Sequence, residues 1–295
     1  TGSDNWTSFD GEVTVDEANK TFSARVTGLD PNTKYSFRAK SAKEAGKRLF
    51  NVETESVETV YNMSFDDWWM NGSVPMPNSG KNVTVWDTAN PGSKLASVFP
   101  TTEETSHVAV PGEGKKAARL ESKEVASMGI LAAGNIYTGK FVSIAGKGAK
   151  LDWGVPFTSR PMAMKGYFDY KPEIINKYFA NKPEMEGKVD ICQIQVFLTD
   201  WETQFRINTK ESTFVDVEND PNIIAYGKLE SNVNTRGYEP FTIRLDYRDL
   251  TRKPTMIVIV AAASKYGDYF TGGLGSTLYV DEFSFVYDPS ELEAE

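Results

Sequence analysis

The stretch Met256-Ile-Val-Ile-Val-Ala-Ala-Ala263 is the longest apolar run in this chain of 295 residues. A membrane-spanning helix needs roughly 20 such residues, so the run suits a buried strand and no membrane span is expected. Turn clusters such as Asn78-Ser-Gly-Lys81 separate further short stretches of strand character. Together these strands, without any long helical pattern, predict an all-β chain built as a jelly-roll β-sandwich. The expected strands are 117–122, 140–144, 164–170, 192–199, 213–217, 223–229, 241–246, 256–263 and 278–287.

Composition supports the all-β prediction and limits the classes of partner that the protein is expected to bind. Aromatic residues make up 12% of the chain, with 17 Phe, 13 Tyr and 6 Trp, a mixture that favours half-buried strands. The 32 basic and 41 acidic residues give a net charge of -9, and the basic residues are scattered along the chain. Nucleic acid is therefore not an expected partner, because a basic stripe is needed to neutralise phosphates.

Several kinds of catalytic and cofactor chemistry lack the residues that they require. Cys192 is the only cysteine, so a disulfide framework and a thiolate metal site are both excluded, and we expect a buried thiol. His107 is the only histidine, and no nucleophile elbow accompanies it. Zinc would lack ligands, and no phosphate-binding glycine loop is present. No cofactor is expected from these patterns.

The first 60 residues differ from the rest of the chain. Three runs, 21–26, 35–40 and 48–53, alternate apolar and polar residues as strands do. The turn before the second run contains Leu29, Pro31, Thr33 and Tyr35. These four residues resemble the Leu-x-Pro-x-Thr-x-Tyr turn of fibronectin type III domains, which are small immunoglobulin-like β domains. The resemblance covers only the last half of such a domain, and we interpret the segment as a spacer.

These observations divide the chain into three parts. Residues 1–60 are predicted to form the partial fibronectin III-like β domain, and residues 61–289 the jelly-roll domain, where composition shifts toward Trp, Gly and Asn. Residues 290–295 form an acidic tail that is expected to be disordered.

Five segments follow in order along the large domain. They are Phe65-Asp-Asp-Trp-Trp69, Gly114-Lys-Lys-Ala-Ala-Arg-Leu120, Gly154-Val-Pro-Phe-Thr-Ser-Arg-Pro161, Lys165-Gly-Tyr-Phe-Asp-Tyr170 and Thr277-Leu-Tyr-Val-Asp-Glu-Phe-Ser-Phe285. Together they are similar to the putative carbohydrate metabolism domain family of Bacteroidetes. The resemblance implies a jelly roll linked to glycan use, with an oligo- or polysaccharide as partner. It also implies a place outside the cytoplasm, as a cell-surface lipoprotein or in the periplasm.

Two of these segments also resemble galactose-binding-like jelly rolls, with Arg119 and Asp281 in comparable places. Such modules often hold a structural calcium between their first and last strands, where this chain has Asp66, Asp67 and Asp281. The resemblance thus implies calcium as a possible metal, with oxygen ligands of the kind that calcium takes. The alternative is that these carboxylates cap turns.

Two loops combine the aromatic and planar polar groups that bind sugars. Sugar C–H faces stack on aromatic rings, and sugar hydroxyls pair with polar side chains. The first loop contributes Trp153, Phe157 and Arg160, and the glycine-rich second loop contributes Tyr266, Asp268 and Tyr269. For Trp153 core packing is the alternative, and for Arg160 it is an ion pair that locks the loop.

The leading hypothesis is noncatalytic glycan binding by a surface or periplasmic protein involved in carbohydrate use, and the sequence leaves enzyme activity open. The first alternative is a glycoside hydrolase with an unrecognised carboxylate pair, for which Glu202 beside Trp201 is a candidate acid. The second is a structural or adhesion protein that binds another surface protein, which a large flat apolar patch would favour.

Overall fold

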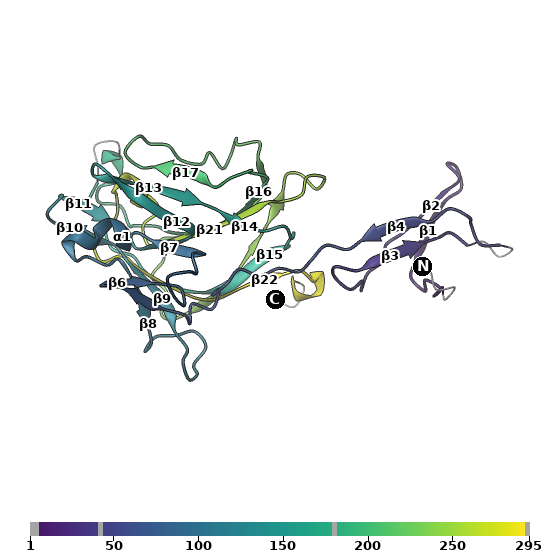
Figure 1. The fold of residues 1–295 in the computed structure, drawn as a ribbon, viewed down its shortest axis with the longest axis horizontal. Coiled ribbons are helices and arrows are strands. Elements are labelled where there is room, and N and C mark those ends of the chain that lie inside the picture. Colours follow the sequence, from purple (N-terminus) through teal and green to yellow (C-terminus); the bar gives the residue numbers. More distant parts are fainter. Residues whose placement is uncertain (1–5, 41–43, 179–181, 293–295) are drawn as a thin grey trace. The chain divides into compact units, whose positions relative to one another are not determined.

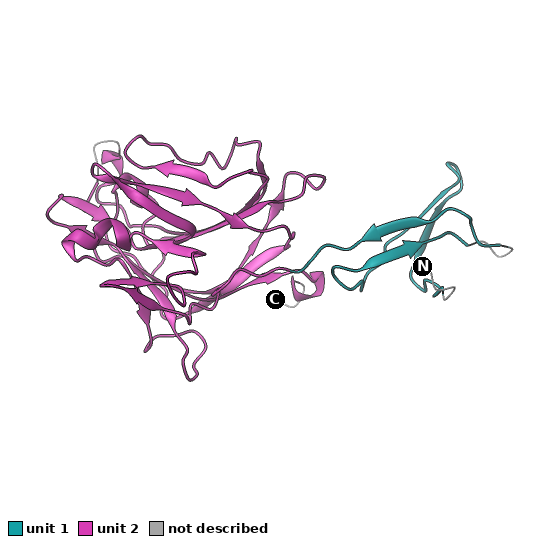
Figure 2. Ribbon diagram, viewed as in Figure 1, with its two compact units in different colours: residues 1–57 teal, residues 58–295 magenta. Residues whose placement is uncertain are grey.

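The structure, a computed structural model, describes residues 6–40, 44–178 and 182–292. It divides into two compact units, Thr1–Val57 and Glu58–Glu295, which are coloured separately in Figure 2. No helix among the described residues is both long enough and apolar enough to cross a membrane.

The first unit consists of two hairpins whose side chains remain largely exposed. The apolar rings of Phe22 and Phe50 are 61% and 53% exposed. The backbone amide of Asp30 donates to the hydroxyl of Tyr35 at 2.8 Å, which closes the predicted turn. The fibronectin type III resemblance stays a prediction. The pairs are β1 (Val13–Asp16) with β2 (Thr21–Ala24), and β3 (Lys34–Phe37) with β4 (Phe50–Glu53).

One face of the second unit is a five-stranded antiparallel sheet, with the order β19-β15-β22-β9-β8 within the described chain. Phe168, Leu278 and Val280 point inward from it and contribute to an inner core. The strands are β8 (Thr101–Glu104), β9 (Ala117–Glu121), β15 (Ala163–Lys171), β19 (Glu239–Arg244) and β22 (Thr277–Val286).

The opposing sheet has β21 (Met256–Ala262) near its middle, which explains the long apolar run. Alternate residues of a strand face opposite sides. Ile257 and Ile259 accordingly enter the inner core, while Val258 and Val260 enter a second, outer core. The other strands are β7 (Trp86–Thr88), β12 (Asn135–Ala145), β13 (Gly148–Trp153), β14 (Val155–Pro156), β16 (Cys192–Thr199), β17 (Phe205–Asn208), β18 (Ile223–Ser231) and β20 (Asp246–Tyr247).

Strand β12 divides this sheet and creates a third layer. Its residues 135–137 pair with β21, whereas residues 139–145 pair with β13, which in turn pairs with β17. The change occurs at Gly139, whose φ is 144°, and a Cβ there would lie 2.1 Å from the carbonyl oxygen of Asp152. The β13–β17 arm therefore covers the side of β21 that faces away from β15 and β22 (Figure 1).

The all-β sandwich prediction is confirmed, with one strand replaced by a loop. In the expected strand 213–217 only Thr213 forms a bridge, with Asn208. The following residues, Phe214, Val215 and Val217, pack instead against the outer core, so their apolar character reflects a covering loop.

The remaining elements are short and lie at the ends of the sheets. In η4 (Pro289–Leu292) the side chain of Leu292 packs with Ala163 and Val286, so the chain is held up to this residue and 293–295 lie outside the described residues. The others are β5 (Trp69–Asn71), β6 (Val74–Met76), β10 (Lys123–Val125), β11 (Ile130–Ala132), α1 (Asn90–Ser93), η1 (Lys94–Ala96), η2 (Pro183–Met185) and η3 (Gly267–Tyr269).

Candidate functional site

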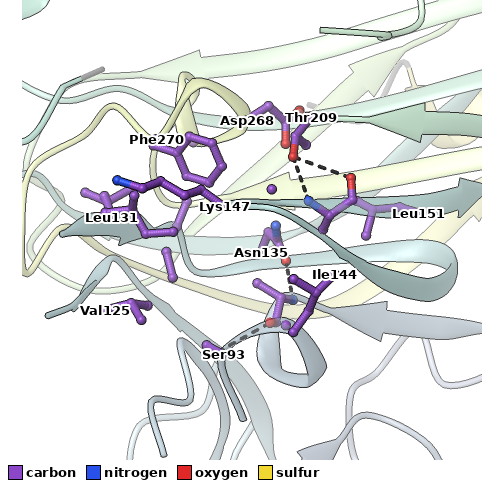
Figure 3. A pocket seen from close by; sticks show the side chains of 18 of the residues that line it. Ser93, Val125, Leu131, Asn135, Ile144, Lys147, Leu151, Thr209, Asp268 and Phe270 are labelled. Carbon is purple, nitrogen blue, oxygen red and sulfur yellow. Dashed lines mark hydrogen bonds between the residues drawn. The ribbon is translucent and has the colours of Figure 1, made fainter. Parts of the chain in front are cut away.

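A pocket opens where the β13–β17 arm leaves the main sheet (Figure 3). The space inside it is about 700 Å³ when the open mouth is included. Strands β12 and β13, the β10–β11 hairpin, α1 and η3 supply its walls. The apolar part of the lining includes Met128, Ile130, Leu131, Ile144, Leu151 and Phe270.

Tyr137 contributes to the lining of this pocket, while its hydroxyl group is buried in the outer core without a partner among the described residues. Tyr137 is only 1% exposed, and its hydroxyl is buried with no hydrogen bond from the described residues. Burial, followed by the charges of Asp87, Asp268 and Asp152, raises the pKa of this phenol well above its usual value. Leaving a buried hydroxyl unpaired costs about 1–3 kcal/mol, so the position calls for an explanation.

The Asp268 carboxyl group lines the same pocket. No hydrogen bond from the described chain perturbs it, and burial alone raises its pKa to about 6. Figure 3 shows Asp268 beside Thr209, across the pocket from Ser93 and Val125. The pocket therefore contains an unpaired carboxyl group, and the unpaired Tyr137 hydroxyl lies buried in the core beside it.

Other polar side chains of the lining are already engaged by the backbone. The Asn135 Oδ1 atom accepts from the Ala89 amide at 2.8 Å, and the Thr209 Oγ1 atom accepts from the Ala149 amide at 2.8 Å. The Ser93 hydroxyl donates to the Val98 carbonyl at 2.6 Å. These contacts stabilise the walls, whereas the Asp268 carboxyl group remains available to a ligand.

A buried carboxylate holds the loop that presents Asp268. The Asp190 Oδ2 atom accepts from the Ser264 hydroxyl at 2.6 Å and from the Gly273 amide at 2.7 Å, while its Oδ1 atom accepts from the Ile191 amide at 2.8 Å. Burial raises the pKa of Asp190 despite these bonds. Because both ends of the loop are fixed, η3 is held at a defined place beside the pocket.

The approach of η3 to the pocket wall depends on a glycine. A Cβ atom at Gly267 would lie 2.3 Å from the Ala133 Cβ atom, far inside contact distance. On either side of Asp268, the rings of Tyr266 and Tyr269 are half-buried. The Lys182 ammonium lies 5.5 and 5.0 Å from their respective ring centroids. Of the predicted trio only Asp268 lines the pocket, while Tyr266 and Tyr269 lie beside it on the same loop and the Tyr269 ring packs 5.0 Å from the Phe214 ring.

The other predicted loop lies at the opposite end of β21. The Phe157 amide donates a hydrogen bond to the Thr255 carbonyl, just before β21 begins. Tyr266, in contrast, lies just after β21 ends. Trp153 is 6% exposed in the outer core, and Phe157 is 2% exposed in the inner core. Neither ring offers a face to a sugar. The structure therefore does not bring Trp153, Phe157 and Arg160 to the pocket.

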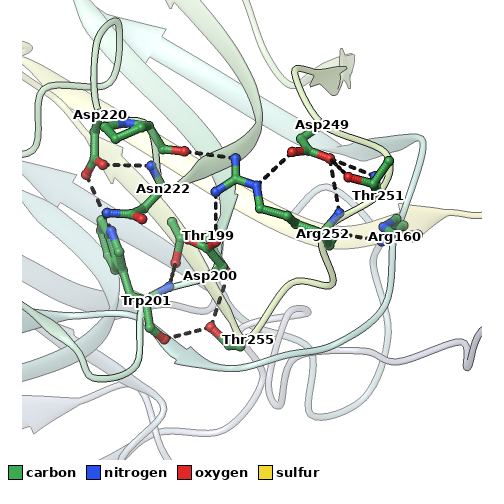
Figure 4. Close-up of polar contacts among 11 residues, drawn as sticks. Arg160, Thr199, Asp200, Trp201, Asp220, Asn222, Asp249, Thr251, Arg252 and Thr255 are labelled. Atoms are coloured by element: carbon green, nitrogen blue, oxygen red, sulfur yellow. Dashed lines mark hydrogen bonds and ion pairs between the residues drawn. The ribbon is translucent and has the colours of Figure 1, made fainter.

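Arg160 takes part in a network that joins loops rather than in a pocket. Its Nη2 atom donates to the Arg252 carbonyl at 2.6 Å. The Arg252 guanidinium contacts Asp200 and Asp249, each at 2.7 Å, and the Pro221 carbonyl at 2.8 Å (Figure 4). This network fixes three loops at the start of β21.

The carboxylates implied for calcium are separately engaged. Asp66 accepts from the Lys115 ammonium at 3.0 Å, Asp67 accepts from the Tyr61 hydroxyl, and Asp281 accepts from the Ala109 amide at 2.7 Å. Burial raises the pKa of Asp281 to about 6. The described residues contain no group of three or more His, Cys, Asp or Glu side chains placed to hold a metal. This arrangement does not fit calcium, since a cationic side chain already neutralises Asp66.

Two further residues considered for catalysis lie away from the pocket. Glu202 is exposed, while its neighbour Trp201 points into the outer core. The His107 Nε2 atom lies 2.7 Å from the buried Asp169 carboxylate, and its ring stacks on Tyr238 with 4.7 Å between centroids. This cluster fixes a loop across the outer face of the five-stranded sheet.

Sequence analysis named Asp268 among its candidates, which stays a prediction, and gave no reason to single out Tyr137. Tyr137 stands in the run Asn135-Ile-Tyr-Thr138, which has no feature that separates it from an ordinary strand. That its hydroxyl lacks a partner follows only from the distant segments that pack around β12.

The family described as "Putative carbohydrate metabolism domain" matches residues 51–286. The chain belongs to this family. This carbohydrate metabolism domain resembles a structure titled a putative glycoside hydrolase from Bacteroides thetaiotaomicron, with 22% identity and a TM-score of 0.61. That alignment covers 95% of this chain and 84% of the other.

A second structure, titled a putative glycoside hydrolase from Bacteroides vulgatus, has 22% identity and a TM-score of 0.55 to this carbohydrate metabolism domain. The alignment covers 70% of this chain and 87% of the other. No curated protein matches the chain. At these identities the two structures share the fold of this domain, and the chemistry has to be argued from its own site.

Proposed function

We propose that this carbohydrate metabolism domain is a noncatalytic glycan-binding module whose site is the pocket beside η3. The observation that carries the proposal is the Asp268 carboxyl group, which lines an open pocket without a hydrogen bond from the described chain. Tyr266 and Tyr269 flank it on a loop that Asp190 fixes. The ligand is an oligo- or polysaccharide, met outside the cytoplasm.

The chemistry of the pocket suits a sugar. A glycan offers hydroxyl groups that can donate to the Asp268 carboxyl group, and C–H faces that pack on aromatic rings. Pairing this carboxyl group removes the cost of leaving it unpaired. Because the loop is fixed before the ligand arrives, little conformational entropy is lost on binding.

A binding role is favoured over hydrolysis by the number of carboxyl groups. Both glycosidase mechanisms need two carboxyl groups across the scissile bond. Asp268 is the only carboxyl-bearing residue among the described residues that line the pocket. Nearby Asp87 accepts from the Thr88 and Phe141 amides, each at 2.8 Å, so both of its oxygens are engaged.

One observation favours hydrolysis as a second candidate. Burial raises the pKa of Asp268 and that of Asp87 to about 6 each, and a carboxyl group in this range can serve as a general acid. Release of reducing sugar that Asp268→Asn abolishes would support this candidate.

The proposal is tested by a glycan-array screen followed by calorimetry on any hit. We expect saturable binding without product release, weakened about three- to tenfold by Tyr266→Ala and by Tyr269→Ala. Tyr167→Ala, a half-buried tyrosine on the outer face of the five-stranded sheet, serves as the control and should bind normally. Equal binding by all variants would exclude this site, and the absence of any glycan ligand would contradict the proposal.

A further inference from the structure

We infer that the pocket beside η3 takes an aliphatic substituent of a glycan, a short alkyl or acyl chain, while the sugar that carries it donates a hydroxyl to Asp268. The inference rests on the proposed function and names the part of the glycan that enters the pocket. The observation that carries it is the lining, which is mainly apolar.

Aliphatic side chains from several elements line the pocket. Leu151 belongs to the outer core, so the pocket adjoins that core, and Leu131 beside it is 1% exposed. Ile144 on β12 is 44% exposed, and the β10–β11 hairpin contributes Met128 and Ile130. Each methylene group buried against such walls strengthens binding by about fourfold. The pocket therefore suits an aliphatic chain.

Few polar atoms of the lining are left for the hydroxyl groups of a sugar ring. The Asn135 Oδ1 and Thr209 Oγ1 atoms each accept from a backbone amide, and the Ser93 hydroxyl donates to a backbone carbonyl. Lys147 also lines the pocket and already has a partner within the protein. Hydroxyl groups placed against the apolar walls would lose their hydrogen bonds to water, which is unfavourable. A bare sugar ring is thus a poorer occupant than an aliphatic chain.

The loop that carries Asp268 supplies contacts for the sugar itself. The Asp268 carboxyl group has no hydrogen bond from the described chain and can accept one from a sugar hydroxyl. Tyr266 and Tyr269 lie on either side of it in sequence, and their half-buried rings can pack against sugar C–H groups. One ligand would therefore place its chain in the pocket and its sugar against the loop.

The test uses alkyl glycosides that differ in chain length alone. Calorimetry on the full chain gives the affinities of methyl, butyl and hexyl β-D-glucosides and of the corresponding β-D-galactosides. In at least one series we expect affinity to rise about tenfold or more from the methyl to the butyl glycoside. The heat-capacity change of binding should become more negative along the same series, because apolar surface is buried. Affinities independent of chain length in both series would overturn the inference.

Two variants on β12 form a matched pair. Ile144 and Val142 are both exposed apolar residues, at 44% and 38%, and of the two Ile144 lines the pocket. Ile144→Asp places a charge on the apolar wall and should remove most of the gain with chain length. Val142→Asp should keep that gain, and thermal unfolding checks that both variants are folded. The same gain in both variants would place the alkyl chain elsewhere and contradict the inference.

The outcomes separate the inference from the proposed function. A glycan that binds through Tyr266 and Tyr269 with no dependence on an aliphatic group overturns the inference and leaves the binding module in place. Butanol and hexanol provide the chain without the sugar, and we expect them to bind more weakly than the matching glycosides. If the alcohols bind as tightly, the pocket takes aliphatic chains without reading a sugar, and the proposed function fails.

Discussion

The loops at the two ends of β21 have similar composition and opposite uses. Residues 153–160 contain Trp, Phe and Arg, but both rings are buried and the arginine joins the Arg252 network. Residues 266–275 contain two half-exposed tyrosines and an aspartate that lines a pocket. Loop composition alone therefore does not identify candidate binding residues, because burial decides which side chains a ligand can reach.

The same contrast appears between the two cores. The inner core buries apolar side chains between two sheets, and Tyr170, its buried tyrosine, donates its hydroxyl to the Ala263 carbonyl at 2.8 Å. In the outer core, the hydroxyl of the buried Tyr137 has no such partner in the described chain. The two buried tyrosines therefore differ in whether the packed layers supply a hydrogen-bond acceptor.

Phe157→Ala should produce the largest effect at the structural end of β21. Its ring is 2% exposed and lies 5.3 Å from the Phe285 ring, so truncation leaves a cavity. We expect the free energy of unfolding to fall by about 3–5 kcal/mol, measured by urea denaturation. Glycan affinity of the folded fraction should stay unchanged. If Phe157→Ala changed glycan affinity as much as Tyr266→Ala does, the interpretation of the first loop as purely structural would be wrong.

Asp190→Ala should weaken the functional end of β21. The variant removes the acceptor of the Ser264 hydroxyl and the Gly273 amide, leaving buried groups unpaired. We expect a loss of about 2–4 kcal/mol in the free energy of unfolding, together with weaker glycan binding because η3 is no longer fixed. The exposed Asp246→Ala is the control, with an expected change within about 0.5 kcal/mol. Unaltered glycan binding would show that the loop needs no such support.

Asp268→Asn should raise stability, in contrast to the two preceding variants. The folded pKa of Asp268, about 6, lies above the ordinary value of 3.8, so the folded state holds its proton more tightly than the unfolded state. This contribution to stability is present below pH 3.8 and is lost as pH rises through about 6. At pH 7.5 we expect the variant to be about 1–3 kcal/mol more stable than the parent, and at pH 4 nearly equal to it.

The pH dependence of this difference is the informative measurement. Chemical denaturation of both proteins at pH 4 and pH 7.5 supplies it. If Asp268→Asn is less stable than the parent at pH 7.5, the Asp268 carboxylate has a favourable partner in the folded protein. Asp268 would then not be free to accept a hydrogen bond from a ligand.

Tyr266→Ala should have the smallest effect on stability. Its half-buried ring packs beside lysine side chains, with Lys265 and Lys182 at 5.6 and 5.5 Å from the centroid. We expect a change of about 0.5–1 kcal/mol or less, measured by thermal unfolding, while glycan affinity falls severalfold. A severe loss of stability would place this ring with the structural aromatics of the first loop.

The sequence alone was enough to predict the all-β sandwich, because strand periodicity and turn residues act locally. The run Met256–Ala262 has to be buried on both faces, and the structure places it between two cores. Tyr266, Asp268 and Tyr269 were also accessible to prediction, since they are close together in the chain and therefore stay together in any fold.

The tertiary structure decided what the sequence left open. Trp153 and Phe157 became core residues because the strands beside them pair with β17 and β21, which are distant in sequence. The division of β12 at Gly139 opened the pocket and placed Tyr137 beside the wall that carries Asp268. Whether a polar atom has a partner depends on segments far apart in the chain, and only the packed layers determine which of them meet.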